Sequence, residues 1–439
     1  MTKYFFSAVL LLFLPLIVAA ESLYDNDLLD VLVAKNILTK EEAAEIKKES
    51  AETPVCSPKT AKRFRTLMIL QTRYTYVDHD YSGAGFSLAD ESRFNIRRFI
   101  PVFIADTSEN SRFMLTLYMP SSSVLNTVDY QIDVKGEILA GKLKFGHWSV
   151  NFATEECDSC SVLKTPDRSI LCLYFGGGDS GYDGYRKTSY GTALGFSGYH
   201  TGVYWDGYIP GNKEFVYSLA VTNSKPNDIC FRYDNGISTW LTLGYDASFE
   251  DYSIITGVTL GYSDKTVSAI DTNVLPSNIS DFGDAYGFNP YFRSTWGDLS
   301  FDAELMFVSV EYGKTRSNDI PMYTTRSATA NPWGFYVLAA YKIFKSERFG
   351  EIEPAFRYSY IDTDGRGIRG CDVIYKMNCG NGLYNKVHSY YAGINWYLNG
   401  RYLKCAFGVE HLDFSGTPAG GAKGAASSNV AIAQLQILF

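Results

Sequence analysis

Alternation between apolar and polar residues along most of the chain is the feature that most limits its fold. From about residue 61 to the C-terminus at residue 439, segments such as 299–311 and 351–361 alternate with period two. This period places successive side chains on opposite faces of a β-strand. After residue 20, no apolar run approaches the roughly 18 residues that a membrane helix needs. Such a chain can enter a membrane only as a closed β-barrel, because no strand edge can stay unpaired there.

Composition and charge exclude several other classes of protein. Hydrophobic residues make up 46% of the chain, which excludes disorder, and the mean hydropathy of −0.11 is too low for a bundle of membrane helices. The net charge of −8 argues against a nucleic-acid partner, because nucleic-acid binders are usually basic. The chain has 33 Tyr against 6 Trp, and this excess suits the aromatic girdles of a membrane barrel.

The first twenty residues predict export. Lys3 provides a positive start, an apolar run extends from Phe5 to Val18, and small residues end at Ala20. This order is typical of a secretory signal peptide, and the apolar run is shorter than the roughly 20 residues of a membrane anchor. We therefore predict that residues 1–20 are a signal peptide cleaved near Ala20.

Residues 21–60 differ from the rest of the chain. Thr39-Lys-Glu-Glu42 reads as a capping box, in which Thr39 caps a short helix and Glu42 occupies the third helical position. Pro54 and a second proline four residues later mark a linker. We predict a periplasmic helical segment and linker over 21–60, with a plug or a trimer contact as its role rather than catalysis.

Residues 61–439 have the plan of a bacterial outer-membrane barrel. Short turns alternate with long polar loops, such as 263–286, 312–331 and 362–386. Short connections on one side and long loops on the other are typical of these barrels. Divided among about 16 strands, the domain has roughly 24 residues for each strand and its connection. The predicted fold is all-β: a transmembrane antiparallel β-barrel of about 16 strands, preceded by a short helical segment.

The end of the chain favours the outer membrane as its location. The last strand carries apolar residues at every second position up to Phe439, and glutamines occupy the other face. A terminal strand of this kind resembles the assembly signal of outer-membrane proteins, although a soluble sandwich can end this way by chance. Together with the signal peptide, the pattern predicts a barrel in contact with outer-membrane lipid in a Gram-negative-type bacterium.

Four stretches have counterparts in one protein family. They are the helical preamble 28–42, Ser92-Arg-Phe-Asn-Ile-Arg-Arg98, Gly141-Lys-Leu-Lys-Phe-Gly146 and Gly393-Ile-Asn-Trp-Tyr-Leu-Asn399. These stretches resemble the phosphate-selective porin O and P family. The resemblance implies a sixteen-stranded homotrimeric porin with an anion-attracting lumen and an inward-folding third loop.

The loop after Gly146 departs from the pattern of that family. Members often carry a basic residue just beyond the aromatic one, followed by a Pro-Phe pair. This chain has Ser149 and Asn151-Phe152 at those places. A basic constriction residue of the family is therefore absent here.

Strand parity predicts a basic wall inside the barrel. On 91–104 and 111–119 the apolar residues share one face, and on 137–146 they do the same, so the basic residues take the luminal face. Guanidinium and ammonium groups attract phosphate or carboxylate oxygens. The predicted pore-lining and anion-binding residues are Arg93, Arg97, Arg112, Lys142 and Lys144. The parity of Arg73 is ambiguous.

Acidic residues on other strands also take luminal parity. They could form an opposite wall, and the resulting transverse field would make selectivity mild. These residues are Asp302, Glu304, Glu351, Glu353 and Glu410. We expect the constriction itself in the loop 147–169.

The cysteines allow several readings. Cys157-Asp-Ser-Cys160 could be a zinc half-site, a redox pair or a local disulfide, and Cys371 with Cys379 could staple the loop 362–386. A disulfide is the default in an exported protein, although the connectivity cannot be read from sequence. No further zinc ligands are visible at suitable spacing, so we predict no metal site. Cys172 falls in a strand pattern and reads as apolar filler.

No spacing among the 5 His residues suggests a metal or a nucleophile–base pair, so we predict neither an enzyme nor a cofactor. The sequence predicts an outer-membrane porin for passive diffusion of small hydrophilic solutes, with a preference for anions such as phosphate. A general or sugar-tolerant porin without this preference is one alternative. A structural or adhesive outer-membrane barrel is the other.

Overall fold

The computed structural model describes residues 63–80, 90–118, 125–136, 139–176, 194, 196–224, 236–264, 284–311, 329–368, 384–416 and 424–439. The predicted signal peptide, the predicted helical segment at 21–60 and the pair Cys371 and Cys379 lie outside these residues. The larger of two compact units contains Thr66–Ile104 and Asn110–Phe439.

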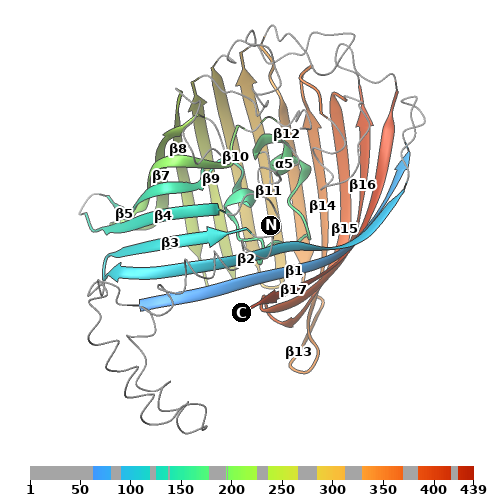
Figure 1. Cartoon of the computed structure of the whole chain (residues 1–439), viewed down its shortest axis with the longest axis horizontal. Helices are drawn as coiled ribbons and strands as arrows, with labels where there is room; N and C mark the ends of the chain where they lie inside the picture. The colour runs from blue at the N-terminus through green and yellow to red at the C-terminus, as the bar shows by residue number, and fades with distance from the viewer. Residues whose placement is uncertain are drawn as a thin grey trace, which may run out of the picture. The chain divides into compact units, whose positions relative to one another are not determined.

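The described strands form one antiparallel sheet that closes into a barrel (Figure 1). Of its 17 strands, β13 (Phe344–Ser346) is a short hairpin strand beside β14, and the other sixteen form the ring. The strands of the ring are β1 (Arg63–Asp80), β2 (Glu91–Ser108), β3 (Ser111–Leu117), β4 (Leu125–Val134), β5 (Ala140–Ser149), β6 (Tyr199–Ile209), β7 (Asn212–Asn223), β8 (Ile237–Ser248), β9 (Tyr252–Ser263), β10 (Ala285–Trp296), β11 (Leu299–Val310), β12 (Trp333–Tyr341), β14 (Gly350–Asp362), β15 (Lys386–Asn399), β16 (Leu403–Ser415) and β17 (Ala426–Leu438). The predicted barrel and its strand number are confirmed.

Alternation along the strands separates an outer apolar face from an inner face. Phe356 on β14 is 61% exposed, whereas its neighbours Ala355 and Arg357 are buried. On β17 the alternation continues to the end, with Leu435 outside and Gln436 fully buried inside. The predicted period two is therefore realised as an apolar surface for lipid and a separate interior.

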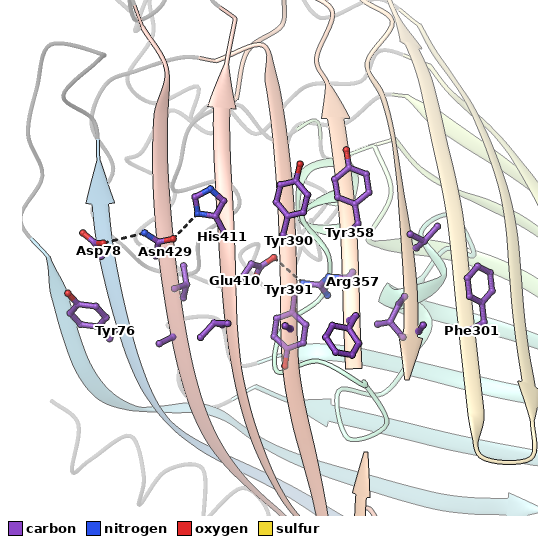
Figure 2. A pocket seen from close by; sticks show the side chains of 18 residues that line it. Tyr76, Asp78, Phe301, Arg357, Tyr358, Tyr390, Tyr391, Glu410, His411 and Asn429 are labelled. Atoms are coloured by element: carbon purple, nitrogen blue, oxygen red, sulfur yellow. Dashed lines mark hydrogen bonds and ion pairs between the residues drawn. The ribbon is translucent and has the colours of Figure 1, made fainter. Parts of the chain in front are cut away.

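The outer surface over β11 to β1 is uneven. Large and small side chains alternate in one row across these strands. Phe301 lies opposite Ala339, and Phe356 lies opposite Ala392. The small residues leave a hollow of about 660 Å³ on this apolar surface. Tyr358 and Tyr390 line this hollow, and Figure 2 shows them side by side on neighbouring strands.

Two short helices lie in the connection between β5 and β6. They are α4 (Thr154–Cys157) and α5 (Ile170–Gly176), and every residue of α5 is buried. Residues of α5 belong to one buried apolar cluster with Met306 of β11 and Tyr336 of β12. Figure 1 shows the helix beside β12. Cys172, which the sequence pattern placed in a strand, lies in α5, because this connection turns inward and buries its apolar residues. Within the described part of the chain, no helix is long and apolar enough to cross a membrane.

The first and last strands close the ring. Strands β1 and β17 pair from Ile69 opposite Leu438 to Asp80 opposite Ser427. At the end of this seam, the Met68 N–H donates to the Phe439 carbonyl oxygen at 2.6 Å, and the Phe439 N–H donates to Met68 at 3.0 Å. The terminal residue thus contributes backbone hydrogen bonds as well as an exposed aromatic side chain.

We expect deletion of Phe439 to destabilise the barrel by about 1–3 kcal/mol, because two backbone hydrogen bonds are each worth about 0.5–1.5 kcal/mol net. The temperature at which the folded form is lost on electrophoresis measures this effect. Phe439→Ala retains both backbone bonds and serves as the control. Equal losses in the two variants would contradict the role of the backbone bonds.

Candidate functional site

The connection after β5 crosses the interior of the barrel. On one side, the carbonyl oxygens of Cys160 and Ser161 accept hydrogen bonds from Gln71 on β1 and Gln436 on β17. On the other side, the Thr154 N–H donates to Glu304 on β11 at 2.7 Å. Strands β1 and β11 lie far apart in the ring, so residues 150–169 span the lumen between them. This segment, which we call the crossing loop, contains most of the predicted constriction.

An ion cluster fixes the crossing loop to β1 and β2. Asp167 forms ion pairs with Arg73 at 2.5 Å and with Arg97 at 2.9 Å. The side chains of the two arginines are at most 2% exposed, and that of Asp167 is 13% exposed. Burial by itself would raise the pKa of Asp167, but the guanidinium groups of Arg73 and Arg97 outweigh it and hold the pKa well below its usual range. The carboxylate therefore stays ionised and holds the loop against this wall.

Arg357 on β14 provides a second attachment. Its Nη1 donates to the Thr165 hydroxyl and to the Asp167 carbonyl oxygen, both at 2.9 Å. Its Nη2 donates to Glu410 on β16 at 3.2 Å, and Figure 2 shows this pair beside Tyr391. Buried charges are stable only when paired and hydrogen-bonded, so full pairing of the Arg357 guanidinium depends on the loop staying in place.

Two lysines reach the same stretch of the loop. Lys404 on β16 donates to the carbonyl oxygen of Leu163 at 2.8 Å. Lys164 of the loop pairs with Glu353 on β14 at 2.7 Å, and the Glu353 side chain is fully buried. Two consecutive residues of the loop, Leu163 and Lys164, are thus attached to β16 and β14.

An aromatic contact fixes the start of the crossing loop. Phe152 packs edge-on against Phe196 and Trp240, with ring centroids 5.1 and 6.1 Å away. Gly287 on β10 makes room for these rings, since a Cβ there would lie 2.3 Å from Phe196 and 2.7 Å from Phe152. The glycine is required for close approach of the loop to the wall.

Basic side chains predominate in one part of the interior and acidic side chains in another, and each part also holds counter-charges, such as Asp167 in the first and Arg293 in the second. One group, the basic side, lies on β1, β2 and β16. The other, the acidic side, belongs to β11 and the crossing loop. The basic side consists of Arg73, Arg97, Arg98 and Lys404. The acidic side consists of Glu155, Asp158, Asp302 and Glu304.

On the acidic side, Arg293 of β10 pairs with Asp158 at 2.8 Å and donates to the Thr154 hydroxyl at 3.0 Å. Burial raises the pKa of Asp158, and the nearby Arg293 opposes this shift. A cavity of about 210 Å³ lies between this part of the loop and the wall, and Asp302 lines it. The interior therefore has a polar space next to the acidic side.

The five predicted basic residues differ in burial and in their partners. Arg97 belongs to the ion cluster, and Lys144 pairs with Asp206 at 2.6 Å and lies 4.8 Å from the Trp148 ring. Arg93 and Arg112 are half-buried, and Lys142 is exposed. Phe94 and Phe113, their chain neighbours, are exposed on the outer face, and Lys144 is directly opposite the buried Tyr204. The five residues thus take the inner face but do not converge on one point.

Sequence parity did not identify several charged residues of the site. Arg98 was not assigned because strict alternation allows only one of two neighbours inside, yet Arg97 and Arg98 are both buried. Arg98 donates to Gln71 at 2.8 Å. Arg357 follows the exposed Phe356, so its parity was a usable signal, whereas Arg293 lies beside the buried Ser294 and gave no clear parity. Arg73, which was ambiguous, lies in the ion cluster.

The cysteines of the crossing loop are free thiols. Cys157 Sγ donates to the Val150 carbonyl oxygen at 3.3 Å, and Cys160 is buried. The Cys157–Cys160 disulfide that the sequence offered as one reading is not formed in this structure, and the Cys157 thiol is directed to a backbone carbonyl instead. The described residues contain no cluster of His, Cys, Asp or Glu that could hold a metal ion.

Comparison with known proteins identifies relatives of this chain. The family model described as phosphate-selective porin O and P matches residues 90–439. The anion-selective porin from Comamonas acidovorans is similar in structure, with a TM-score of 0.53 and 11% identity over 86% of this chain and 99% of that one. The outer membrane channel DcaP of Acinetobacter baumannii has a TM-score of 0.52 and 10% identity over 87% and 98% of the two chains. The curated proteins contain no match. At these identities the two structures support the fold alone.

We expect Asp167→Asn to release the crossing loop, because it leaves Arg73 and Arg97 as buried charges without a counter-charge. The cost of such a loss is about 3–5 kcal/mol. Reconstituted channels should show a larger and noisier single-channel conductance. Asp251→Asn, on an exposed turn, is the matched control. Wild-type conductance in the Asp167 variant would show that the ion cluster does not hold the loop.

The contribution of Asp167 should persist in mild acid. A carboxylate with a lowered pKa in the folded protein stabilises it fully above the unfolded value near about 4, and this stability is lost as pH falls through the lowered value. The difference in thermal stability between wild type and Asp167→Asn should therefore stay constant from pH 8 to about pH 5 and shrink only below about pH 4. Thermal unfolding in detergent at several pH values measures it. A difference that disappears between pH 6 and pH 5 would refute the assignment.

Proposed function

The chain belongs to the phosphate-selective porin O and P family, and from this we propose that it allows passive diffusion of small hydrophilic solutes with a preference for anions such as phosphate. The family and the barrel place it in the outer membrane as a channel rather than an enzyme. The choice of solute is the part that goes beyond family and fold.

The basic side of the lumen is the observation that supports anion preference. Arg73, Arg97 and Arg98 are all buried close together, and Asp167 is the carboxylate paired with the first two. A low-dielectric barrel focuses such a field into its channel, even though the whole chain carries a net charge of −8. Transport requires attraction that is weak enough for release, and buried charges attract anions without binding them directly.

More accessible cations line the inner face of β2, β3 and β5. Arg93, Arg112 and Lys142 are half-buried or exposed, so solutes can approach them more closely than the buried arginines. Arginine forks bind phosphate or carboxylate oxygens in pairs, and lysine contributes a mobile point charge. We assign the first contacts with anions to these residues.

The acidic side favours a second candidate, a general porin with little selectivity. Asp302 lines the polar cavity inside the barrel, and Asp158 of the crossing loop lines the same cavity. A transverse field formed by opposite walls attracts ions of both signs to different places, which weakens selectivity. We therefore propose that the preference for anions is mild.

The remaining elements of the proposal concern processing and assembly. The signal peptide is removed near Ala20, residues 21–60 remain in the periplasm, and three copies of the chain assemble into a homotrimer. The resemblance of the preamble 28–42 and the strand motifs to the family supports this arrangement.

We expect wild-type channels in a salt gradient to show a reversal potential of the sign for anion preference. The triple variant Arg93→Gln, Arg112→Gln, Lys142→Gln should shift this potential toward zero, because it removes the accessible positive charges and leaves the ion cluster intact. Lys213→Gln, an exposed lysine beside a short turn, is the control. Cation preference in the wild type would favour the general porin, and the absence of any conductance would favour a structural or adhesive barrel.

A further inference from the structure

The polar cavity inside the barrel has a lining of both charge signs. It lies between residues 155–164 of the crossing loop and the inner faces of β9 to β12. Asp302 and Arg293 come from the wall, and Asp158 and Lys164 come from the loop. Its volume is about 210 Å³, below the roughly 300–1,000 Å³ of pockets for drug-sized ligands. The cavity therefore suits a small, highly polar solute.

The three carboxylates of this lining differ in how they are used. Asp158 is paired with Arg293 at 2.8 Å. Glu155 accepts hydrogen bonds from the Ser169 N–H at 2.8 Å and from the Ser169 hydroxyl. Asp302 lies directly opposite Arg293 on β10, yet the guanidinium of Arg293 is directed to Asp158, and among the described residues Asp302 has no hydrogen bond or ion pair. Its carboxylate oxygens therefore remain able to accept hydrogen bonds from a positive group in the cavity.

The positive charges of the cavity lie on the loop and on β10. The guanidinium of Arg293 is directed to Asp158 and Thr154, which the loop supplies. Lys164 is paired with the buried Glu353, yet 26% of its side chain is exposed, so its ammonium group retains donors for a solute. Opposite charges are thus presented to one small space by different elements.

We propose that this cavity is a subsite for small zwitterionic solutes of the α-amino-acid type. The primary ammonium group of the solute pairs with Asp302, and its carboxylate is directed toward Lys164. Leu163 and Leu338, which also line the cavity, accommodate a short aliphatic side chain. This inference rests on the proposed channel function and specifies one class of solute.

The separated charges of the lumen support this orientation. A zwitterion has a large dipole, and the field between the basic and acidic sides aligns it across the channel. Because the lining is partly exposed, each contact is modest, as is needed for a solute that must leave again. A simple anion has no group that can use Asp302.

Proteoliposome swelling with L-alanine and with neutral lactamide of similar size tests the proposal. For the wild type, we expect alanine to enter at least threefold faster than lactamide. Asp302→Asn should remove this difference without changing lactamide entry, and Asp302→Glu should keep part of it. Asp251→Asn, on an exposed turn, provides the same chemical change at a residue that does not line the cavity.

Equal rates for alanine and lactamide in wild-type vesicles would overturn the subsite, and so would an unchanged difference in Asp302→Asn. If Asp302→Asn fails to fold, a measurement on the wild type alone still tests the proposal. In single wild-type channels, alanine should reduce the KCl conductance more than lactamide does. Conductance without any excess effect of alanine refutes this inference only. A wild type with neither KCl conductance nor swelling refutes the proposed function itself.

Discussion

The requirement that every backbone group in the membrane has a partner underlies the whole structure. Strands meet this requirement only when the sheet closes, and pairing of β1 with β17 closes it here. Closure then imposes two faces with different solvents, lipid outside and a confined interior. Charged side chains have only the interior to occupy, because a lysine or arginine at the middle of the lipid face costs about 2–4 kcal/mol.

The confined interior explains why the crossing loop is held so firmly. A loop that lies across a barrel must satisfy its own backbone and also the wall groups that it covers. Wall side chains provide many of the hydrogen bonds that the loop backbone needs. Gln71, Gln436 and Lys404 donate to loop carbonyl oxygens. Asp167 then neutralises arginines that its own segment shields from water. Loop and wall therefore stabilise each other, and neither conformation is independent of the other.

Sequence reasoning predicted the barrel because period two depends only on local order along each strand. Parity placed Phe356 outside and Glu353 inside, and both positions agree with the structure. It failed where a local rule was broken, as at Arg97 and Arg98, which are both buried. It also missed the apolar part of the interior, because Met306 shares one buried cluster with residues of α5, a helix 130 residues earlier in the chain. The partners of Asp167 are similarly distant in sequence, and no local pattern indicates them.

The burial of the basic side determines how selectivity can arise. The guanidinium groups of Arg73 and Arg97 donate hydrogen bonds to Asp167. An anion in the lumen would therefore be attracted by their charge without forming hydrogen bonds to them. Long-range attraction of this kind favours entry of all anions by similar amounts and adds no strong binding. Discrimination between solutes requires groups with spare donors or acceptors, such as Asp302 and the exposed part of Lys164. The two proposals are therefore compatible, because the proposed mild preference for anions and the proposed contact for solutes that carry both charges depend on different residues.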